Sequence, residues 1–359
     1  MPSYINNITE AIGNTPLLKL NRITTPGGAS VFIKLEHLNP SGSYKDRMAL
    51  QMVEAAEQGL TWNGRKLSPG GTVVDASAGN TAPAVAIVCA AKGYNARFVL
   101  YRYSYKEGAT NARSLITSAF GPEVFISTEP EKYLAPEQAA AFFKAQPDLP
   151  HVIAGKVDCA NMEIEDPNCV WVDQIYNKQN YIGQKSMAKE IYHQLDGKID
   201  AWGCSVGSGA TLFGVYLGFK ELGLTPGITF GAVPDGTEQY LELQGRENNR
   251  GEFKVNEINK KISGAMGLDK WVTEQPIVEE MIDSGCPDKI FCISDEDARD
   301  MANRLCREEG VFCGMSSGAN VVAALKIAAN MREDQNVVTT VVDRRDRYLS
   351  ETPNERYAV

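Results

Sequence analysis

The chain has 359 residues, of which 43% are hydrophobic and 23% charged, and its formal net charge at pH 7 is −9. This composition is that of an ordinary globular protein, and the length suits two domains better than one. The acidic balance argues against nucleic acid or an anionic membrane as the main partner. No apolar run could span a bilayer, and the polar start of the chain lacks the layout of a signal peptide, so we expect a cytoplasmic protein.

The elements expected from the sequence alternate between short β-branched runs and helix-like segments. In chain order they are a strand at 31–35, a helix at 45–59, a strand at 72–76, a helix at 80–92, a strand at 96–101, a helix at 107–119, a strand at 123–126, helices at 135–145 and 185–195, a strand at 199–204, a helix at 211–222, strands at 228–233 and 289–293, helices at 295–310 and 318–331, and a strand at 337–343. The alternation predicts parallel sheets covered on both faces. The polar regions 146–170 and 245–261 are expected to be loops or a crossover.

The cysteines and histidines predict neither disulfides nor a metal centre. Eight cysteines are scattered through strand-like and helix-like segments, and none forms a C-x-x-C pair. The chain length and the lack of a secretion signal favour reduced thiols. With three histidines and no metal-ligand spacing, we expect no metal site and no histidine-based nucleophilic triad.

A single lysine, Lys45, follows the turn-forming run N-P-S-G-S at 39–43 and begins a helix-like segment. One interpretation is that Ser43 or a neighbour caps the helix and that Lys45 is an ordinary solvated lysine. However, the partial positive charge at a helix N-terminus disfavours a lysine's protonated form. A neutral amine is a nucleophile that forms a Schiff base with an aldehyde. This stretch alone leaves both interpretations open.

The first of three further small-residue turns runs from Ser77 to Thr81, between a strand and an Ala/Val-rich helix. Small residues let a ligand approach the backbone, and the N–H groups of the helix start can bind a carboxylate. The alternative is a plain strand-to-helix turn with Asn80 as the cap.

The second turn is Gly207-Ser208-Gly209-Ala210-Thr211, which suits a phosphate bound by backbone N–H groups, two hydroxyls and a helix dipole. It is neither a Walker A loop nor a complete dinucleotide fingerprint.

In the third turn, Ser316 could hydrogen-bond a ring nitrogen, although N-capping by Ser316 or Ser317 is the simpler alternative. An imine-forming lysine, a carboxylate cradle, a phosphate cradle and a serine for a ring nitrogen together describe pyridoxal phosphate holding an amino acid.

The order and wording of these motifs resemble the O-acetylserine sulfhydrylase (cysteine synthase) and cystathionine β-synthase family of fold-type II pyridoxal-phosphate enzymes. The similarity extends over nearly the whole chain, and S-G-S-x-K-D-R is its most specific part. The matching segments are IGNTPLLKLNRI (12–23), IKLEHLNPSGSYKDR (33–47), SAGNTA (77–82), WVDQIYNKQNYIGQKSMAKEI (171–191), GSGAT (207–211), KISGAMG (261–267), GMSSGA (314–319) and RYLSE (347–351).

The resemblance implies a role for each matching position. Lys45 would form the Schiff base with pyridoxal 5'-phosphate and then act as acid and base at the substrate Cα. Asn80 would hydrogen-bond the ring hydroxyl of the cofactor, and Ser316 would face its pyridine nitrogen. The residues implied to hold the phosphate are Gly207, Ser208, Gly209, Ala210 and Thr211. The residues implied to bind or line the substrate site are Ser77, Ala78, Gly79, Thr81, Gln174 and Gly264.

The resemblance also implies a fold and a reaction. The fold would be α/β, with two domains of mostly parallel sheets flanked by helices and the cofactor in the cleft between them. Residues 1–47 and 166–359 would form the larger, cofactor-binding domain, and 48–165 the smaller, mobile, substrate-binding domain. The reaction would be β-substitution on an O-activated L-serine through an aminoacrylate. The partners would be this amino acid, a small-molecule nucleophile and a second copy of the chain in a homodimer.

The chain departs from the family pattern at four places, one of which is Val233-Pro234-Asp235 where the family usually has Glu-Pro. The carboxylate loop has Ala78 where the family usually has a serine, which removes a hydrogen-bonding hydroxyl near the substrate. Region 127–170 lacks the family's usual wording. The sequence V-V-D-R-R-D-R ends the last strand, and its arginines, at 344, 345 and 347, suggest either a solvated or salt-bridged cluster or a preference for an anionic substrate.

These departures keep other functions open. The same cofactor could serve an O-phosphoserine donor, an amine or carbon nucleophile, or γ-substitution on an activated homoserine. A different class is a catalytically silent relative that binds another protein. A nicotinamide oxidoreductase is a further class, which the missing dinucleotide fingerprint argues against.

Overall fold

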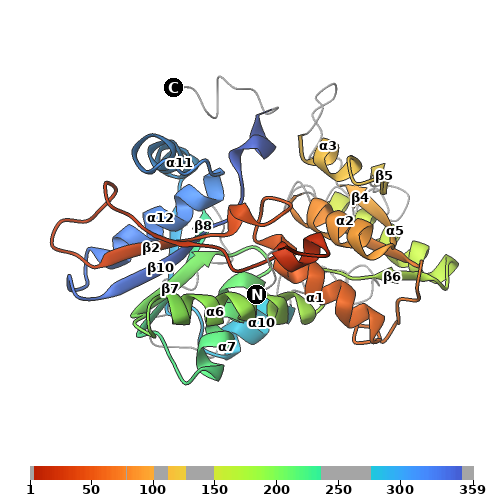
Figure 1. Cartoon of the computed structure of the whole chain (residues 1–359), viewed down its shortest axis with the longest axis horizontal. Coiled ribbons are helices and arrows are strands. Elements are labelled where there is room, and N and C mark those ends of the chain that lie inside the picture. Colours follow the sequence, from red (N-terminus) through yellow and green to blue (C-terminus); the bar gives the residue numbers. More distant parts are fainter. Residues whose placement is uncertain (1–3, 78, 101–111, 127–148, 236–275, 350–359) are drawn as a thin grey trace. The chain divides into compact units, whose positions relative to one another are not determined.

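The computed structural model describes residues 4–77, 79–100, 112–126, 149–235 and 276–349. The chain divides into two compact units. Unit 1 comprises Met1–Met48, Asn180–Val255 and Pro276–Val359, and unit 2 comprises Ala49–Gln179 and Asn256–Gln275. The first boundary falls inside helix α1 (Lys45–Glu57), which therefore begins in unit 1 and continues in unit 2 (Figure 1).

Unit 1 contains a six-stranded sheet in the order β1-β2-β10-β7-β8-β9. The strands are β1 (Leu17–Lys19), β2 (Ser30–Leu35), β7 (Ala201–Ser205), β8 (Ile228–Pro234), β9 (Lys289–Ile293) and β10 (Asn336–Val341). The edge strand β1 is antiparallel to β2, and the other pairings are parallel. This order places β10, the last strand in the sequence, beside β2, so segments from both ends of the chain meet within the sheet.

Helices cover both faces of this sheet. They are α6 (Gln179–Gln194), α7 (Ala210–Glu221), α10 (Pro276–Asp283), α11 (Asp295–Glu309) and α12 (Met315–Ala328). Neighbouring strand residues alternate between two core clusters, as the two-residue period of a strand requires. Trp202 and Val338 pack with α6, α7 and α10, whereas Ala201 and Val337 pack with α11 and α12. Burial on both faces explains why these strands are continuous apolar runs.

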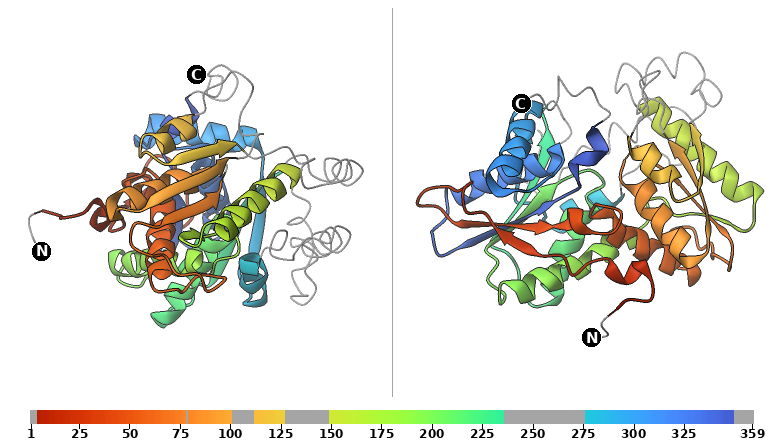
Figure 2. Two further views of the ribbon diagram at one scale, coloured as in Figure 1. Left: turned by 90° about the vertical axis from the view of Figure 1, so that its right-hand side faces the viewer. Right: turned by 45° about the horizontal axis from the view of Figure 1, so that its top comes forward.

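Unit 2 contains a four-stranded parallel sheet in the order β5-β4-β3-β6. Its strands are β3 (Thr72–Ala76), β4 (Asn95–Leu100), β5 (Glu123–Ile126) and β6 (Cys169–Trp171). Its other helices are α2 (Thr81–Lys92), α3 (Ala112–Ser118) and α5 (Leu149–Glu165). Helix α5 packs against β3, β4 and β6, and α2 packs against β3, β4 and α3 (Figure 2). The α/β class with parallel sheets flanked by helices is thus confirmed, and the assignment of domain roles remains a prediction.

All eight strands expected from the sequence are present, with bounds that differ by a few residues at most. The loop expected at 146–170 is wrong, because this region forms α5 and β6. Proline in the first turn of α5 is compatible with a helix start, and the buried Ala154 and Cys159 anchor the helix despite Gly155. The helix expected at 185–195 begins earlier, at Gln179. The expected helix at 135–145 and loop at 245–261 lie outside the described residues.

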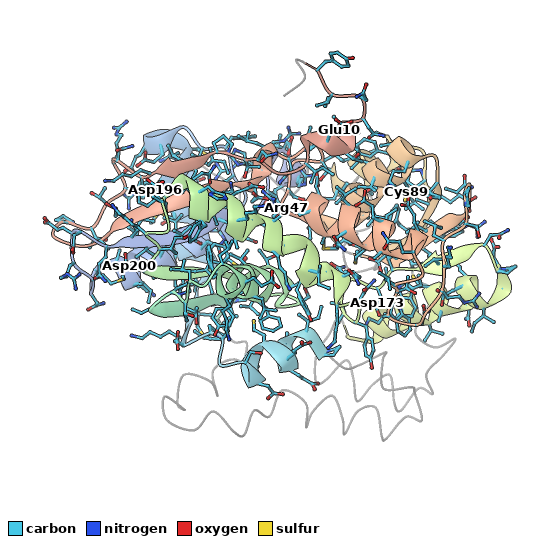
Figure 3. All side chains as sticks on the ribbon, turned by 60° about the horizontal axis from the view of Figure 1, so that its bottom comes forward. Glu10, Arg47, Cys89, Asp173, Asp196 and Asp200 are labelled. Carbon is cyan, nitrogen blue, oxygen red and sulfur yellow. The ribbon has the colours of Figure 1, made fainter. Side chains whose placement is uncertain are left out.

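A network of buried charges ties β2 and the start of α1 to α6. Its central residue, Arg47, is labelled in Figure 3. Arg47 forms a two-pronged pair with Glu36, with Nε–Oε2 and Nη2–Oε1 distances of 2.7 and 2.8 Å. Its Nη1 also lies 2.7 Å from Oε1 of Glu190, and Lys34 Nζ lies 2.7 Å from the other oxygen of that carboxylate. Burial opposes the charged form of Glu190, but Arg47 and Lys34 outweigh it and lower its pKa to about 2. Each charge in the network is therefore paired.

The buried network predicts that Arg47→Ala is strongly destabilising. The change leaves Glu36 buried without its counter-ion, which typically costs about 3–5 kcal/mol. The control is Arg304→Ala, which breaks an exposed pair with Glu308 on α11 and is expected to change stability too little to measure. Urea unfolding followed by circular dichroism compares the two. Equal stability of the two variants would contradict the role of the network.

Candidate active site

Lys45 lies at the first position of α1, and the loop before it is fastened to the end of β10. Tyr44 N–H donates to the Val342 carbonyl at 3.0 Å, and Ser43 forms an isolated bridge with Asp343. Gly42 has a φ of +88°, a left-handed conformation that favours glycine. Because β10 is central in the sheet, these bonds hold the lysine at the carboxyl end of the strands, where ligands bind in open α/β sheets.

The loop after β7 leads into α7 with the geometry of an anion cradle. Gly209 occupies the N-cap position with a φ of +78°, and no side chain caps the helix. A Cβ on Gly207 would meet nothing within 4 Å, so a ligand can approach the backbone there. Asn180 Nδ2 donates to Ser208 Oγ at 3.4 Å, and Thr211 lies in the first turn of α7. These backbone N–H groups, hydroxyls and helix dipole fit the phosphate of pyridoxal phosphate.

Ser316 lies inside the first turn of α12 and is partly buried. The N-cap is Gly314, so the interpretation that Ser316 or Ser317 caps this helix is wrong. Ser317 Oγ instead accepts the N–H of Val342 at 2.9 Å. The start of α12 and the Lys45 loop therefore both bond to the segment that follows β10. Unit 1 thus brings Lys45, the 207–211 cradle and Ser316 to the carboxyl ends of one sheet.

The predicted carboxylate loop lies in unit 2, between β3 and α2. Ser77 Oγ accepts the N–H of Gly79 at 3.1 Å. Asn80 is at the N-cap position but makes no side-chain capping bond, so the simple-cap interpretation fails. Thr81 Oγ1 donates to Gln174 Oε1 at 2.5 Å, which joins two residues separated by 93 positions in the sequence. The structure thus brings Ser77, Gly79, Asn80, Thr81 and Gln174 together. Ala78 and Gly264 lie outside the described residues.

Two buried acids beside this loop were missed by the sequence analysis. Asp75 is the last residue but one of β3, and Asp173 directly precedes Gln174. Burial and the nearby Asp173 raise the pKa of Asp75 to about 8, so it holds a proton at neutral pH. Trp171 Nε1 donates to it at 3.3 Å, and Asp173 Oδ2 lies 3.8 Å from Lys156 Nζ. The sequence feature that could have identified Asp75 is a carboxylate near the end of an otherwise apolar strand.

Two of the three arginines after β10 are buried, which corrects the solvated interpretation, whereas the salt-bridged interpretation agrees with the pairs that Arg344 and Arg347 form with Asp346. Arg345 is 9% exposed and donates to the Cys313 carbonyl at 3.1 Å and to Asn303 Oδ1 at 2.9 Å. Arg347 is fully buried and donates to the carbonyl of Ser41, in the loop that precedes Lys45. Arg344 has a side chain that is 46% exposed and pairs with Asp346 at 2.9 Å. Of the three arginines, Arg344 is the one that remains accessible to an anion.

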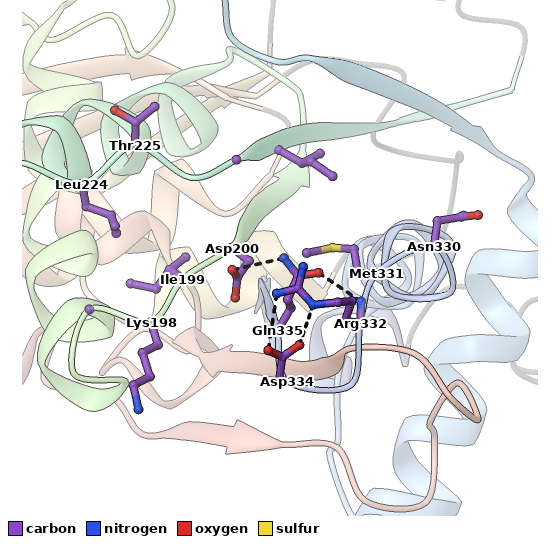
Figure 4. Close-up of a pocket in the computed structure, with 13 residues that line it drawn as sticks. Lys198, Ile199, Asp200, Leu224, Thr225, Asn330, Met331, Arg332, Asp334 and Gln335 are labelled. Atoms are coloured by element: carbon purple, nitrogen blue, oxygen red, sulfur yellow. Dashed lines mark hydrogen bonds and ion pairs between the residues drawn. The ribbon is translucent and has the colours of Figure 1, made fainter.

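A cavity of about 590 Å³ lies elsewhere in unit 1, at the amino ends of β7, β8 and β10 (Figure 4). Its polar groups bond to one another: Arg332 pairs with Asp334 at 2.9 Å, and Gln335 Nε2 donates to Asp200 Oδ1 at 3.3 Å. The Lys45 loop and the phosphate cradle lie at the opposite, carboxyl ends of these strands. This cavity is therefore not the candidate active site.

Within the described part of the chain, no group of acidic, histidine or cysteine side chains could hold a metal ion. All eight cysteines fall in that part, and each is a free thiol. None of the helices there is long and apolar enough to cross a membrane.

The different burial of Arg345 and Arg344 predicts that alanine substitutions at the two positions lower the free energy of unfolding by different amounts. Arg345→Ala removes charged donors from two buried acceptors and should lower the free energy of unfolding by about 1.5–3 kcal/mol. Arg344→Ala is the matched control, and loss of its exposed pair should cost at most about 1 kcal/mol. The measurement is urea unfolding of both variants. A larger loss for Arg344→Ala would contradict the structural role of Arg345.

Comparison with known proteins agrees with this geometry. The family described as pyridoxal-phosphate dependent enzyme matches residues 8–343. Cysteine synthase 1 of Emericella nidulans is 34% identical over 96% of this chain and 84% of that protein, and a Staphylococcus aureus cysteine synthase is 31% identical over 96% of each. The structure of an O-acetylserine dependent cystathionine beta-synthase from Helicobacter pylori has a TM-score of 0.73 at 25% identity, covering 98% of this chain and 99% of that one. Cysteine synthase from Entamoeba histolytica has a TM-score of 0.72 at 26% identity, covering 100% and 93%.

These matches confirm the family inferred from the motifs, and with it pyridoxal 5'-phosphate as the cofactor. The residues in the cradle, the lysine loop and the start of α12 fit that cofactor on their own geometry. The chain belongs to the pyridoxal-phosphate dependent enzyme family and is an enzyme of the cysteine synthase type.

Proposed function

We propose that the protein catalyses β-substitution on an O-activated L-serine to make cysteine or a cysteine-like amino acid. The observation that carries the proposal is the placement of Lys45, the 207–211 cradle and Ser316 at the carboxyl ends of one sheet in unit 1. The cysteine synthases among its relatives give the substrate class. When bound, the cofactor supplies an electron sink for the charge that develops at the substrate Cα.

In this proposal, unit 1 holds the cofactor and moves the proton. Lys45 carries the cofactor aldehyde between turnovers, and its amine then removes and returns the proton at the substrate Cα. The cradle of Gly207, Ser208, Gly209, Ala210 and Thr211 holds the phosphate through N–H groups and hydroxyls. The Ser316 hydroxyl would face the ring nitrogen. A hydroxyl keeps that nitrogen less protonated than a carboxylate would, which favours rapid loss of the leaving group.

Unit 2 binds the substrate carboxylate in this proposal. Ser77, Ala78, Gly79 and Thr81 contribute the small-residue loop at the start of α2, Asn80 contacts the ring hydroxyl, and Gly264 lines the site. Because Gln174 Oε1 accepts a hydrogen bond from Thr81, the amide orientation is set. Its NH₂ group is then the donor that a substrate carboxylate requires.

The proposal extends to domains, assembly and location. Unit 2 forms the mobile, substrate-binding domain, whose closure excludes water during the reaction, and unit 1 forms the cofactor-binding domain. The chain works as a homodimer in the cytoplasm. Resemblance to the family supports the domain roles and the dimer, and the reduced cysteines support the location.

A second candidate is the same chemistry with an anionic donor or an acidic amine nucleophile. The exposed Arg344 favours it, because this side chain lies beside the Lys45 loop. A Cβ placed on Gly42 in that loop would lie 3.0 Å from the Arg344 Nε. The missing hydroxyl at Ala78 also changes the loop that receives the substrate. Similar structures include a hydrogen sulfide-producing enzyme from Fusobacterium nucleatum, which shows that this fold accommodates more than one reaction.

The proposed role of Lys45 predicts that Lys45→Ala loses turnover and the visible absorbance of the covalently bound cofactor together. The reason is that alanine has no amine to bond the aldehyde or to carry the proton. The control is Lys19→Ala, on the exposed edge strand β1, which should keep both properties. Absorbance spectra and activity assays of the two purified variants measure this. Normal turnover by Lys45→Ala would refute the assignment.

The proposed substrate class predicts the outcome of a panel of donors. O-acetylserine with sulfide should change the cofactor spectrum and give product, whereas O-acetylhomoserine should do neither. Turnover with the homoserine ester alone would overturn β-substitution.

The variant Arg344→Ala tests the second candidate, because a raised KM for O-phosphoserine alone would identify the anionic donor. An unchanged KM for O-phosphoserine would exclude this role of Arg344.

A further inference from the structure

Gln174, which the proposed function assigns to the substrate carboxylate, lies in a turn that depends on Asp173. The Asp173 Oδ1 atom accepts the N–H groups of Ile175 and Tyr176, at 2.9 and 3.2 Å. The Asp173 carbonyl accepts the N–H of Asn177 at 2.9 Å. Three backbone N–H groups after Gln174 are therefore bonded to the residue before it, and Asp173 sets the path of the chain on both sides of Gln174.

The backbone of Asp173 has a conformation that few residues adopt. Its φ is +35°, in the left-handed region, which aspartate tolerates because its short polar side chain bonds locally. The two bonds that Oδ1 accepts are local bonds of this kind. Asp173 is 1% exposed, so these bonds do not compete with water. Asparagine can accept the same bonds at this φ, whereas alanine can accept neither and is strained there.

A buried ion pair joins Asp173 to helix α5. Lys156 Nζ lies 3.8 Å from Asp173 Oδ2, and the two side chains are 4% and 2% exposed. The neighbouring Asp75 is also buried, and burial raises its pKa to about 8, so it is uncharged at neutral pH. Asp173 is therefore the acid that balances the charge of Lys156, and the turn is held against α5 by this pair.

Aromatic rings pack against both ends of the same turn. The Trp62 ring centroid lies 5.3 Å from that of Trp171, before the turn, and 5.4 Å from that of Tyr176, within it. Trp62 Nε1 also donates to the Trp171 carbonyl at 3.0 Å. With the backbone held in this way, the side chain of Gln174 is oriented by Thr81, whose hydroxyl donates to Gln174 Oε1 at 2.5 Å.

We propose that Asp173 is a positioning residue that holds Gln174 in the orientation that binds the substrate carboxylate. Asp173 fixes the backbone of Gln174 and Thr81 fixes its amide, so Gln174 is ordered before the substrate arrives. A donor that is already ordered loses little conformational entropy when it binds an anion. This inference rests on the proposed function, which assigns Gln174 to the substrate carboxylate.

The experiment compares Asp173→Ala with Asp173→Asn in the cofactor-loaded enzyme. Dissociation constants for L-serine and for L-serinamide, which lacks the carboxylate, are measured from the change in the cofactor's absorbance. Asp173→Ala should weaken serine binding about five-fold, because the turn loses two hydrogen bonds, and leave serinamide binding unchanged. Asp173→Asn keeps both bonds and should bind serine within about two-fold of the unaltered protein. If Asp173→Ala does not fold, Asp173→Gly removes the same acceptor without strain at this φ and has the same expected result.

The control is Asp166→Ala, in the turn before β6. Asp166 Oδ1 accepts the N–H of Asn168 at 2.9 Å, so the same kind of bond is lost at the opposite end of β6 from Gln174. This variant should change neither dissociation constant.

A second measurement introduces Asp173→Ala into a Gln174→Ala background. Because Asp173 acts through Gln174, the change should weaken serine binding no further in that background. An equal loss of serine binding with and without Gln174 would overturn the inference, since Asp173 would then act by another route.

The outcomes separate this inference from the proposed function. If the unaltered protein binds serine no more tightly than serinamide, the carboxylate site of the proposed function fails. If it prefers serine and Asp173→Ala keeps that preference in full, the inference alone fails. An equal loss for both ligands also overturns the inference, since it indicates general disruption of the site. A loss in Asp173→Asn as large as that in Asp173→Ala would show that the two hydrogen bonds do not position Gln174.

Discussion

The buried pairing of Arg47 with Glu36 and Glu190 is the constraint on which the arrangement of unit 1 depends. A buried charge without a partner is costly, so these side chains can be accommodated only when the start of α1, the turn after β2 and helix α6 lie together. Lys45 is two residues from Arg47 on the same helix, and its position is therefore set by the same pairing. The network thus holds the end of α1 that carries Lys45 in place.

The end of β10 is where the parts of the site in unit 1 converge. Val342 forms hydrogen bonds both to the Lys45 loop and to the first turn of α12. Arg347 donates a hydrogen bond to the Ser41 carbonyl in the same loop. Because parallel strands present their carboxyl ends at one edge, residues from distant parts of the sequence meet there. Unit 2 uses the same geometry at the end of β3, where Asp75 and Asp173 lie beside the proposed carboxylate loop.

The sequence predicted the parallel strands well, because a strand buried on both faces is a continuous apolar run with turn residues at its ends. It failed at α5, whose glycine and polar residues hide a helix that depends on tertiary packing of Ala154 and Cys159. The glycine turns and Lys45 were readable because their local chemistry is distinctive. Arg345 was not, since the partner that defines its position is far away in the sequence.

The proposed chemistry requires that Lys45, and not another lysine, carries the cofactor. The direct measurement is reduction of the cofactor-loaded protein with borohydride, which converts the lysine–cofactor bond into a stable amine, followed by mass spectrometry of its peptides. We expect the added mass on the peptide that contains Lys45. Added mass on a different lysine, or on none while the visible band is present, would contradict it.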